Sequence, residues 1–508
     1  MTYLKRATRH RAWLTLLLAP LLVAAEPAPE AGDESPPPPT AEAPSARRRA
    51  APPEVFEDGL GHYYADDFES AAAEMFDYLS TNEDTVENYE WAEYFLGVSL
   101  KELGFTHAAA EYLYNVAKNR TRPEILPEAL EQIEVLMQGP HDEELLFRRL
   151  LVDSEFGYLP GRVADFVNYK KAMADLLDGR IEWAERLFDE LPDDSPFKPE
   201  AIYTVGVQRL KGNRMTDAVK KFRTALNHPL ANRDTRNKSR LALARILYEK
   251  ERYASARKLY DQVEVPELTT AEASLYLEKA WTSYFLKDYR RTMGILYALE
   301  APSYRTYFAP ERFLLRALVY RSLCHYIPAK REIRRFNFRY DRTLANIRAR
   351  IDLRDDEVLR TAALSRGALQ GVADFRRLLS DEADRIDTIG GSWVEVGLDE
   401  HLRRLYALKA EQVDLHLASE LTKATRAVAE ELVDFEEQMY LLDYEVGLEI
   451  YKRLRKENAR RPSKADNLDI PYGGDQVYYA FDDEFWNDEL AHYDFFVENR
   501  CFDEGGDE

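Results

Sequence analysis

Apolar residues in the segment 199–229 recur with helical spacing and are interrupted by one turn. The pattern predicts two short amphipathic helices that are joined at Lys211-Gly212-Asn213, with the second ending before Pro229. The small residues Gly206 and Ala218 fall on the faces that meet, where they let two helix backbones approach closely. A helix pair of this size cannot bury its apolar face alone, so we expect neighbouring pairs of the same kind.

The same spacing of small and aromatic residues recurs on both sides of this pair. Ala184, Ala218 and Ala256 take equivalent places in three successive units, and residues 124–160 form a degenerate unit. This recurrence resembles the tetratricopeptide repeat (TPR), a helix–turn–helix unit of 34 residues. The resemblance implies an all-α fold, a TPR superhelical solenoid of about eight repeats over residues 54–338.

The repeat period stops after Tyr340, and residues 339–462 are predicted to form a long helical, coiled-coil-like region. The segment 400–457 contains no proline, and its apolar residues from Leu417 to Ile450 form one stripe with helical spacing. A long helix with one apolar stripe needs a covering surface. Two partners remain open at this point: residues 341–390 as an antiparallel hairpin, or another chain.

The last segment, residues 463–508, is both aromatic and acidic. It is too apolar for a free tail, so we expect it to dock on the solenoid. The only two cysteines of the chain are Cys324, assigned to the first helix of the last repeat, and Cys501 in this tail. They form either a disulfide that staples the tail over the last repeat, or one buried and one free thiol.

The N-terminus has the pattern of an exported protein. Residues 1–25 combine a basic start, an apolar run and small residues before Ala25, which predicts a signal peptide that is cleaved after Ala25. No cysteine for a lipid anchor lies near the cut, and no later stretch is apolar enough for a membrane helix. Residues 26–53 are rich in proline and alanine, which predicts a disordered linker. The expected location is therefore the periplasm or the medium, without direct membrane insertion.

The net charge and the absence of known catalytic motifs disfavour several classes of function. The net charge of −22 disfavours binding to nucleic acid, and we expect no basic stripe on the protein. None of the common nucleotide, zinc-protease, redox or serine-hydrolase motifs occurs, so we expect no enzyme, no cofactor and no metal site. His107 is predicted to serve in helix packing or on the surface rather than as a ligand, and the acidic cluster within 482–489 to be solvated charge.

In the TPR family, side chains of the first helix of each repeat line the concave groove. Carried over to this sequence, the resemblance implies a protein-binding groove that contains Tyr94, Tyr169, Tyr203, Arg245, Tyr248, Trp281, Tyr284 and Arg321. The sequence departs from the Lys and Asn pattern with which the best-known members bind a terminal carboxylate. An aromatic groove suits an apolar or extended segment or a helix, while the alternative is that these aromatics pack between repeats.

The architecture as a whole resembles the periplasmic TPR proteins of Gram-negative bacteria, including those of envelope-spanning and gliding-motility machines. The resemblance implies an exported scaffold that binds other envelope proteins through its groove and its long helix. The alternative is a periplasmic chaperone or a cell-wall-associated factor that holds clients transiently. The oligomeric state is left open by the sequence.

Overall fold

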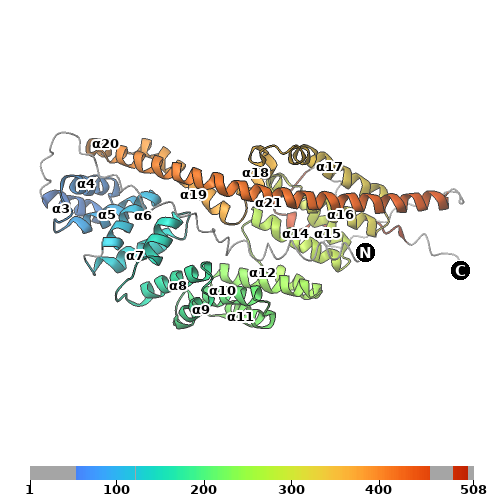
Figure 1. Ribbon diagram of the computed structural model, residues 1–508, viewed down its shortest axis with the longest axis horizontal. Coiled ribbons are helices and arrows are strands. Elements are labelled where there is room, and N and C mark those ends of the chain that lie inside the picture. Colours follow the sequence, from blue (N-terminus) through green and yellow to red (C-terminus); the bar gives the residue numbers. More distant parts are fainter. Residues whose placement is uncertain (1–52, 120–121, 458–483, 502–508) are drawn as a thin grey trace. The chain divides into compact units, whose positions relative to one another are not determined.

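The computed structural model describes residues 53–119, 122–457 and 484–501, and within these ranges every regular element is a helix (Figure 1). The predicted signal peptide, nearly all of the predicted linker and the first part of the tail lie outside the described residues. The all-α prediction, helical repeats followed by a long C-terminal helix, is confirmed. Within the described ranges, no helix combines the length and the apolarity that crossing a bilayer requires.

The described chain divides into two compact units, and each is presented by itself. The N-unit comprises the residues up to Ala231 together with Gly367–Ser419, and the C-unit comprises Asn232–Arg366 together with the residues from Glu420 onward. The boundary at Ala231 therefore falls inside the segment 54–338 that the sequence assigns to one solenoid. Both units also take residues from the predicted coiled-coil region.

The N-unit consists mainly of helical hairpins. Consecutive helices pack in the pairs α3–α4, α5–α6, α8–α9 and α10–α11. The degenerate unit differs, because its second element is a π-helix, η1, that packs on α6 and α8. The elements are α3 (Pro53–Tyr64), α4 (Phe68–Thr81), α5 (Tyr89–Glu102), α6 (Thr106–Asn119), α7 (Ile125–Leu136), η1 (Glu143–Val152), α8 (Gly161–Leu177), α9 (Ile181–Glu190), α10 (Lys198–Lys211), α11 (Met215–Asn227), α19 (Gly367–Arg385), η4 (Ile386–Thr388) and α20 (Gly391–Val396).

The α10–α11 hairpin shows why small residues mark these pairs. A Cβ atom on Gly206 would lie 2.8 Å from Cε1 of Phe222, closer than real side-chain contacts allow. Ala218, Phe222 and Ala225 on the facing helix are all buried. Asn213 in the connecting turn has a φ of 58°, a conformation that asparagine tolerates better than most residues. The close approach predicted for Gly206 is thus present, and Ala218 is buried as expected.

The C-unit contains three further hairpins among its described residues, α12–α13, α14–α15 and α16–α17. Arg316 on α16 is fully buried, and its guanidinium contacts Glu300 at 2.5 Å and Glu332 at 3.3 Å. The elements are α12 (Arg233–Glu249), α13 (Tyr253–Tyr260), α14 (Thr270–Phe285), α15 (Tyr289–Ala298), η2 (Pro302–Tyr304), α16 (Glu311–Ser322), α17 (Tyr326–Arg348), η3 (Leu353–Asp355), α18 (Glu357–Leu364) and η5 (Leu490–His492).

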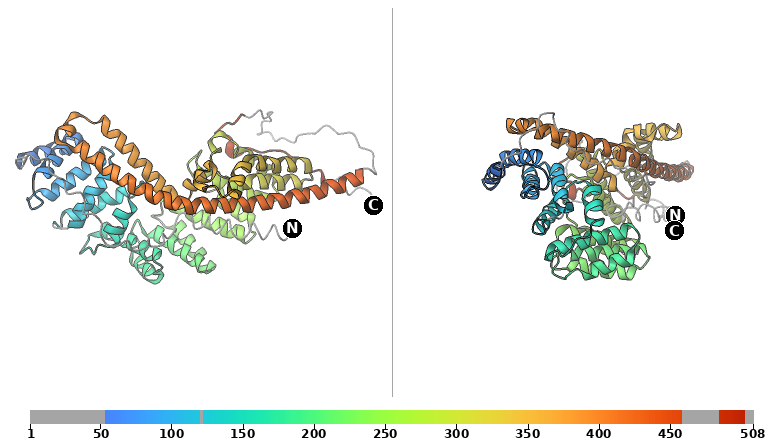
Figure 2. Two further views of the ribbon diagram at one scale, coloured as in Figure 1. Left: turned by 45° about the horizontal axis from the view of Figure 1, so that its top comes forward. Right: turned by 60° about the vertical axis from the view of Figure 1, so that its left-hand side comes forward.

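The predicted long helix is α21 (Leu398–Glu457), 60 residues without a break (Figure 2). Its first part belongs to the N-unit, where it pairs with α19. The guanidinium of Arg376 donates to Asp414 at 2.8 Å, and the hydroxyl of Tyr406 donates to Glu382 at 2.7 Å. Residues nearer the end of α19 thus meet residues nearer the start of α21, as in an antiparallel hairpin. The first of the two open partners therefore covers this part of the helix.

From Glu420 onward α21 packs on the C-unit. Its buried row consists of Val428, Leu432, Phe435, Met439, Leu442 and Val446. Ion pairs flank this row, with Lys330 3.0 Å from Asp443 and Arg321 2.6 Å from Glu445. One face of the helix is therefore held by α16 and α17 through both apolar and charged contacts.

The described part of the tail, residues 484–501, lies against α15 and the turn after α16. The ring of Phe495 stacks on Tyr297 at 4.4 Å, and Arg291 donates to the carbonyl oxygen of Tyr493 at 3.2 Å. Cys501 is bonded to Cys324 with an S–S distance of 2.11 Å. Cys324 follows the end of α16 in the turn to α17, so its assignment to the helix itself was wrong by a short distance.

Replacing Gly294 by alanine is expected to detach the tail from α15. A Cβ atom there would lie 1.8 Å from the carbonyl oxygen of Tyr493, and because this contact is with backbone, no side-chain rotation can relieve it. We expect the C-unit to keep its helical content but lose about 1–3 kcal/mol of stability. Limited proteolysis with mass spectrometry should show faster cleavage within 484–501.

Gly447→Ala is the matched control, because the nearest atom to its new Cβ would be Nζ of Lys330 at 4.0 Å. Cleavage of Gly294→Ala at the wild-type rate would contradict the close contact between the tail and α15.

Candidate functional site

The tyrosines predicted for the groove of the N-unit are buried. Tyr94, Tyr169 and Tyr203 all lie in the interior rather than on an open surface. The ring of Tyr169 stacks on Phe197 at 5.5 Å, and that of Tyr203 contacts Phe222 at 5.4 Å. The Tyr203 contact joins the two helices of one hairpin, and the Tyr169 contact joins α8 to the residue that precedes α10. They favour the packing alternative for these three residues.

The groove residues of the C-unit are also engaged. Tyr248 and Trp281 are buried, and the indole of Trp281 donates to Glu311. Arg245 forms an ion pair with the buried Glu278 at 2.6 Å.

The remaining two predicted groove residues face internal partners as well. The hydroxyl of Tyr284 lies 3.4 Å from Oγ of Ser322, and Arg321 binds Glu445 of α21. In the C-unit, Arg321 is therefore engaged by α21. A binding role for the eight residues stays a prediction, and their contacts within the chain give each of them a structural role.

Burial perturbs one carboxyl group of the N-unit strongly. Glu93 on α5 is buried, and its Oε2 has no hydrogen-bond partner among the described residues. Removal from water, reinforced by the negative charges of Glu90 and Asp84, raises the pKa of Glu93 to about 8. The side chain is therefore uncharged in the folded protein at neutral pH.

Glu93→Gln is expected to stabilise the N-unit at pH 8 but not at pH 4. Below pH 4.5 the carboxyl of Glu93 is protonated in both the folded and the unfolded chain. Between 4.5 and about 8 only the unfolded chain ionises, so wild-type stability falls as the pH rises. The variant lacks this loss, and its Tm relative to wild type should increase by several degrees over the interval.

Thermal unfolding at a series of pH values measures this difference in Tm. Glu83→Gln, at an exposed position, is the control, and parallel curves of Tm against pH for wild type and Glu93→Gln would refute the prediction.

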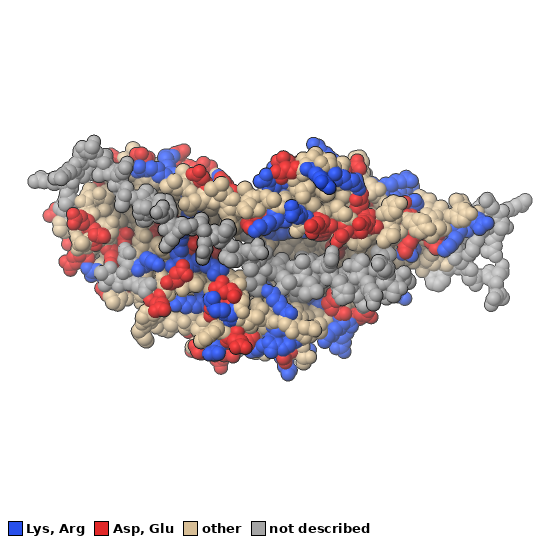
Figure 3. All heavy atoms as spheres, in the orientation of Figure 1, with Lys and Arg blue, Asp and Glu red and all other residues tan. Residues whose placement is uncertain are grey.

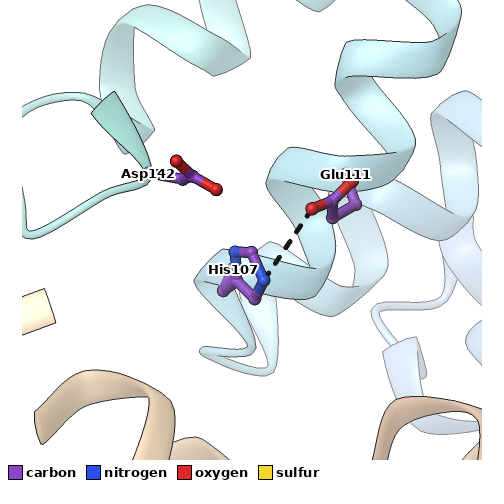
Figure 4. Close-up of side chains that lie close together, drawn as sticks. All are labelled: His107, Glu111 and Asp142. Carbon is purple, nitrogen blue, oxygen red and sulfur yellow. Dashed lines mark ion pairs between the residues drawn. The ribbon is translucent and has the colours of Figure 1, made fainter. Parts of the chain in front are cut away.

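Three side chains with metal-ligand chemistry gather elsewhere in the N-unit (Figure 4). His107 and Glu111 lie one turn apart on α6, with 3.8 Å between Nε2 and Oε1, and Asp142 precedes η1. One ligand atom from each falls within 4.8 Å of the others. Burial lowers the pKa of His107 to about 4, so its ring is neutral. The buried ring contacts Phe375 and Tyr406, which favours the packing role over the surface role that the sequence also allowed.

A lysine of α21 supplies the positive charge of this cluster. Nζ of Lys409 forms an ion pair with Oδ2 of Asp142, while Oδ1 of Asp142 accepts the backbone N–H of Leu145 at 3.1 Å and so caps η1. The carboxylate is thereby held from both sides without a further cation. We assign the cluster to the attachment of α21 to α6 and η1.

No protein-family profile and no curated protein matches the chain. Among solved structures, a tetratricopeptide repeat protein from Parabacteroides merdae is 13% identical with a TM-score of 0.24, covering 56% of this chain and 91% of that one. A Rap protein complexed with competence and sporulation factor is 16% identical with a TM-score of 0.25, covering 72% of this chain and 98% of that one.

The chain has a TPR-like fold. Because both TM-scores are low, this assignment rests on the helix pairs of the chain itself, and nothing about function is taken from the two structures. Helical hairpins of this kind leave extended surfaces exposed.

One such surface lies on α17 of the C-unit. Ile327 and Phe338 are exposed large apolar side chains, and arginines with helical spacing share their side of the helix. We call this surface the α17 face, and it consists of Ile327, Arg331, Arg334, Arg335, Phe338 and Arg342. Basic side chains are visible over this part of the C-unit in Figure 3. The expectation that the chain has no basic stripe was therefore wrong for α17.

The α17 face could have been found in the sequence. Its arginines alternate with the buried residues Ile333, Phe336 and Tyr340 of the last repeat, so the amphipathic period was visible. The net charge of the whole chain is strongly negative, so it gives no sign of the excess of arginine on this one helix.

Proposed function

We propose that this protein is a scaffold that binds other proteins and helps to assemble a complex of the cell envelope. The observation that carries the proposal is the α17 face, where four arginines share one side of the helix with Phe338, which is 92% exposed. Large exposed apolar groups with arginine around them are typical of protein-binding surfaces. The face suits an acidic partner segment that also offers an apolar side chain.

The chemistry of the α17 face favours a protein over a nucleic acid. Ile327 and Phe338 lie within the basic row, where a phosphate backbone would gain nothing from them. The net charge of −22 also opposes the approach of a polyanion over any longer distance.

Export is proposed from the N-terminal sequence. Residues 1–25 have the three parts of a signal peptide. N-terminal sequencing of protein isolated from the producing cells should begin at Glu26, and fractionation should place it outside the inner membrane. A full-length chain that starts at Met1 and remains in the cytoplasm would refute this part of the proposal.

Reversal of two arginines on the α17 face is expected to remove partners selectively. The double variant Arg331→Glu, Arg334→Glu should capture its envelope partners about tenfold less well than wild type, because like charges would then oppose each other. Affinity capture from an envelope extract with quantitative mass spectrometry measures this loss.

The control carries the same charge change elsewhere. Arg223 on α11 and Arg360 on α18 are exposed, so Arg223→Glu, Arg360→Glu should capture the wild-type set of proteins. A fixed set of proteins lost only from the α17 variant supports a scaffold. Many unrelated unfolded proteins would instead identify the alternative, a chaperone, and equal capture by all three proteins would refute the role of the α17 face.

A further inference from the structure

The C-terminal end of α21 carries a second apolar row, on the side away from the C-unit. Leu441, Tyr444, Leu448 and Tyr451 are 51%, 64%, 41% and 57% exposed. We call these four residues the α21 seam. They differ from the buried row of Leu442 and Val446, which faces α16 and α17. Figure 3 shows uncharged surface over this end of the helix.

The spacing of the α21 seam is that of a coiled coil. The four residues follow one another at intervals of three, four and three positions. This alternation keeps apolar side chains on one line along a helix, and such a line is covered when a second helix packs against it. Tyr440 and Leu454, which are also exposed, flank the α21 seam on one side.

Charged residues continue the same line at both ends. Glu437 lies four residues before Leu441, and Arg455 lies four residues after Tyr451. Both side chains are exposed. The surrounding sequence is also acidic first and basic afterwards. No lysine or arginine occurs between Arg426 and Lys452, whereas acidic residues are frequent there.

These positions are self-complementary when two copies of the helix run in opposite directions. With Tyr444 of one copy opposite Leu448 of the other, Leu441 meets Tyr451 and Glu437 meets Arg455. Each contact then occurs twice, as the two-fold symmetry of a homodimer requires. In a parallel pair, by contrast, Glu437 would face Glu437 and Arg455 would face Arg455.

We infer that two copies of this chain associate through the α21 seam as an antiparallel helix pair with Glu437 opposite Arg455. The charge pattern favours a second copy over an unrelated helix. When the copy runs in the opposite direction, each residue of the line meets a complementary one. The inference goes beyond the proposed function, and it uses a different surface from the α17 face.

Charge reversal at the two ends of the α21 seam provides the test. Glu437→Arg places two arginine pairs in the interface, and Arg455→Glu places two glutamate pairs there. The dissociation constant of the dimer should therefore be at least about tenfold higher for each single variant than for wild type. The double variant Glu437→Arg, Arg455→Glu exchanges the partners and should recover the wild-type dissociation constant. Sedimentation equilibrium on the full mature chain measures all four proteins.

Mixing the two single variants gives an independent signature of the antiparallel arrangement. The Glu437→Arg chain is basic at both ends of the α21 seam and the Arg455→Glu chain is acidic at both, so the mixture should form heterodimers with the wild-type dissociation constant. In a parallel pair the wild type itself would carry like charges face to face, and the mixture would then dimerise more tightly than wild type. Glu267→Arg, at an exposed loop position of the C-unit, is the charge-matched control and should dimerise as wild type does.

Each outcome decides for or against the inference. A wild-type chain that stays monomeric at the highest soluble concentration would overturn it, and would indicate that another segment of the same chain or another protein covers the α21 seam. Dimers unaffected by the single reversals, or a double variant that is not restored, would also overturn it. Circular dichroism separates these results from unfolding, and capture of envelope partners by the α17 face can succeed or fail independently.

Discussion

Replacing Trp393 by alanine is expected to cost the N-unit about 3–5 kcal/mol of its free energy of unfolding. Trp393 on α20 is fully buried, and its ring lies 5.3 Å from that of Phe105. Its indole N–H donates to the backbone carbonyl of Glu69 at 3.1 Å. Truncation would leave a cavity and an unpaired carbonyl where α20 contacts α4, so the connection between α19 and α21 should also loosen.

Trp183→Ala is the matched control for this prediction, because Trp183 belongs to the same unit and is 58% exposed. Chemical denaturation followed by circular dichroism should show a large loss for Trp393→Ala and a change of at most about 1 kcal/mol for Trp183→Ala. Equal and small losses for both variants would show that α20 contributes little to the core of the N-unit.

Loss of the disulfide is expected to be the second large effect. The bond between Cys324 and Cys501 joins residues 177 positions apart, and a cross-link of that span restricts the unfolded chain by about 5 kcal/mol in the chain-entropy relation. Cys501→Ser should therefore lower the denaturant midpoint of the C-unit. The tail should remain in partial contact, because His325 still bonds the carbonyl of Glu498 at 2.6 Å.

Reduction of the wild-type protein provides the control for the cysteine variants. Cys324→Ser, Cys501→Ser and the reduced wild type should share one lowered midpoint, and the double variant should not fall further. Variants that unfold at the midpoint of the oxidised protein would show that the bond does not restrain the C-unit. Two free thiols in the unreduced, denatured mature protein would rule out the bond itself.

The hairpins were predictable because their signal is local. Gly206, Ala218 and Phe222 lie within one helix pair, where the ring of Phe222 packs directly against Gly206 and Ala218 is buried. The long helix was predictable for the same reason, since its apolar stripe and the absence of proline are properties of one continuous segment.

The environment of the predicted groove residues was not predictable, because it depends on contacts between distant segments. Whether Trp281 faces solvent or Glu311, and whether Arg321 is available or bound to Glu445, is decided by how the hairpins and α21 pack. The same holds for His107, whose neighbours Phe375 and Lys409 come from the last third of the chain. A family pattern predicts which position of a helix a residue occupies, but it does not predict which other segment of the chain packs on that position.

The N-unit is built from two separate segments of the chain, so its parts become available for folding at different times. Whether it leaves the ribosome or crosses a membrane, the chain emerges N-terminus first, so α3 to α11 appear before the residues of the C-unit up to Arg366, and α19, α20 and the start of α21 appear only afterwards. Until Trp393 and Tyr406 emerge, Phe105 and His107 lack the side chains that bury them in the finished protein. The N-unit therefore begins first and finishes late, whereas the hairpins of the C-unit can form in between. A nascent chain that stalls before residue 393 would expose this apolar surface and would be a substrate for folding factors or proteases.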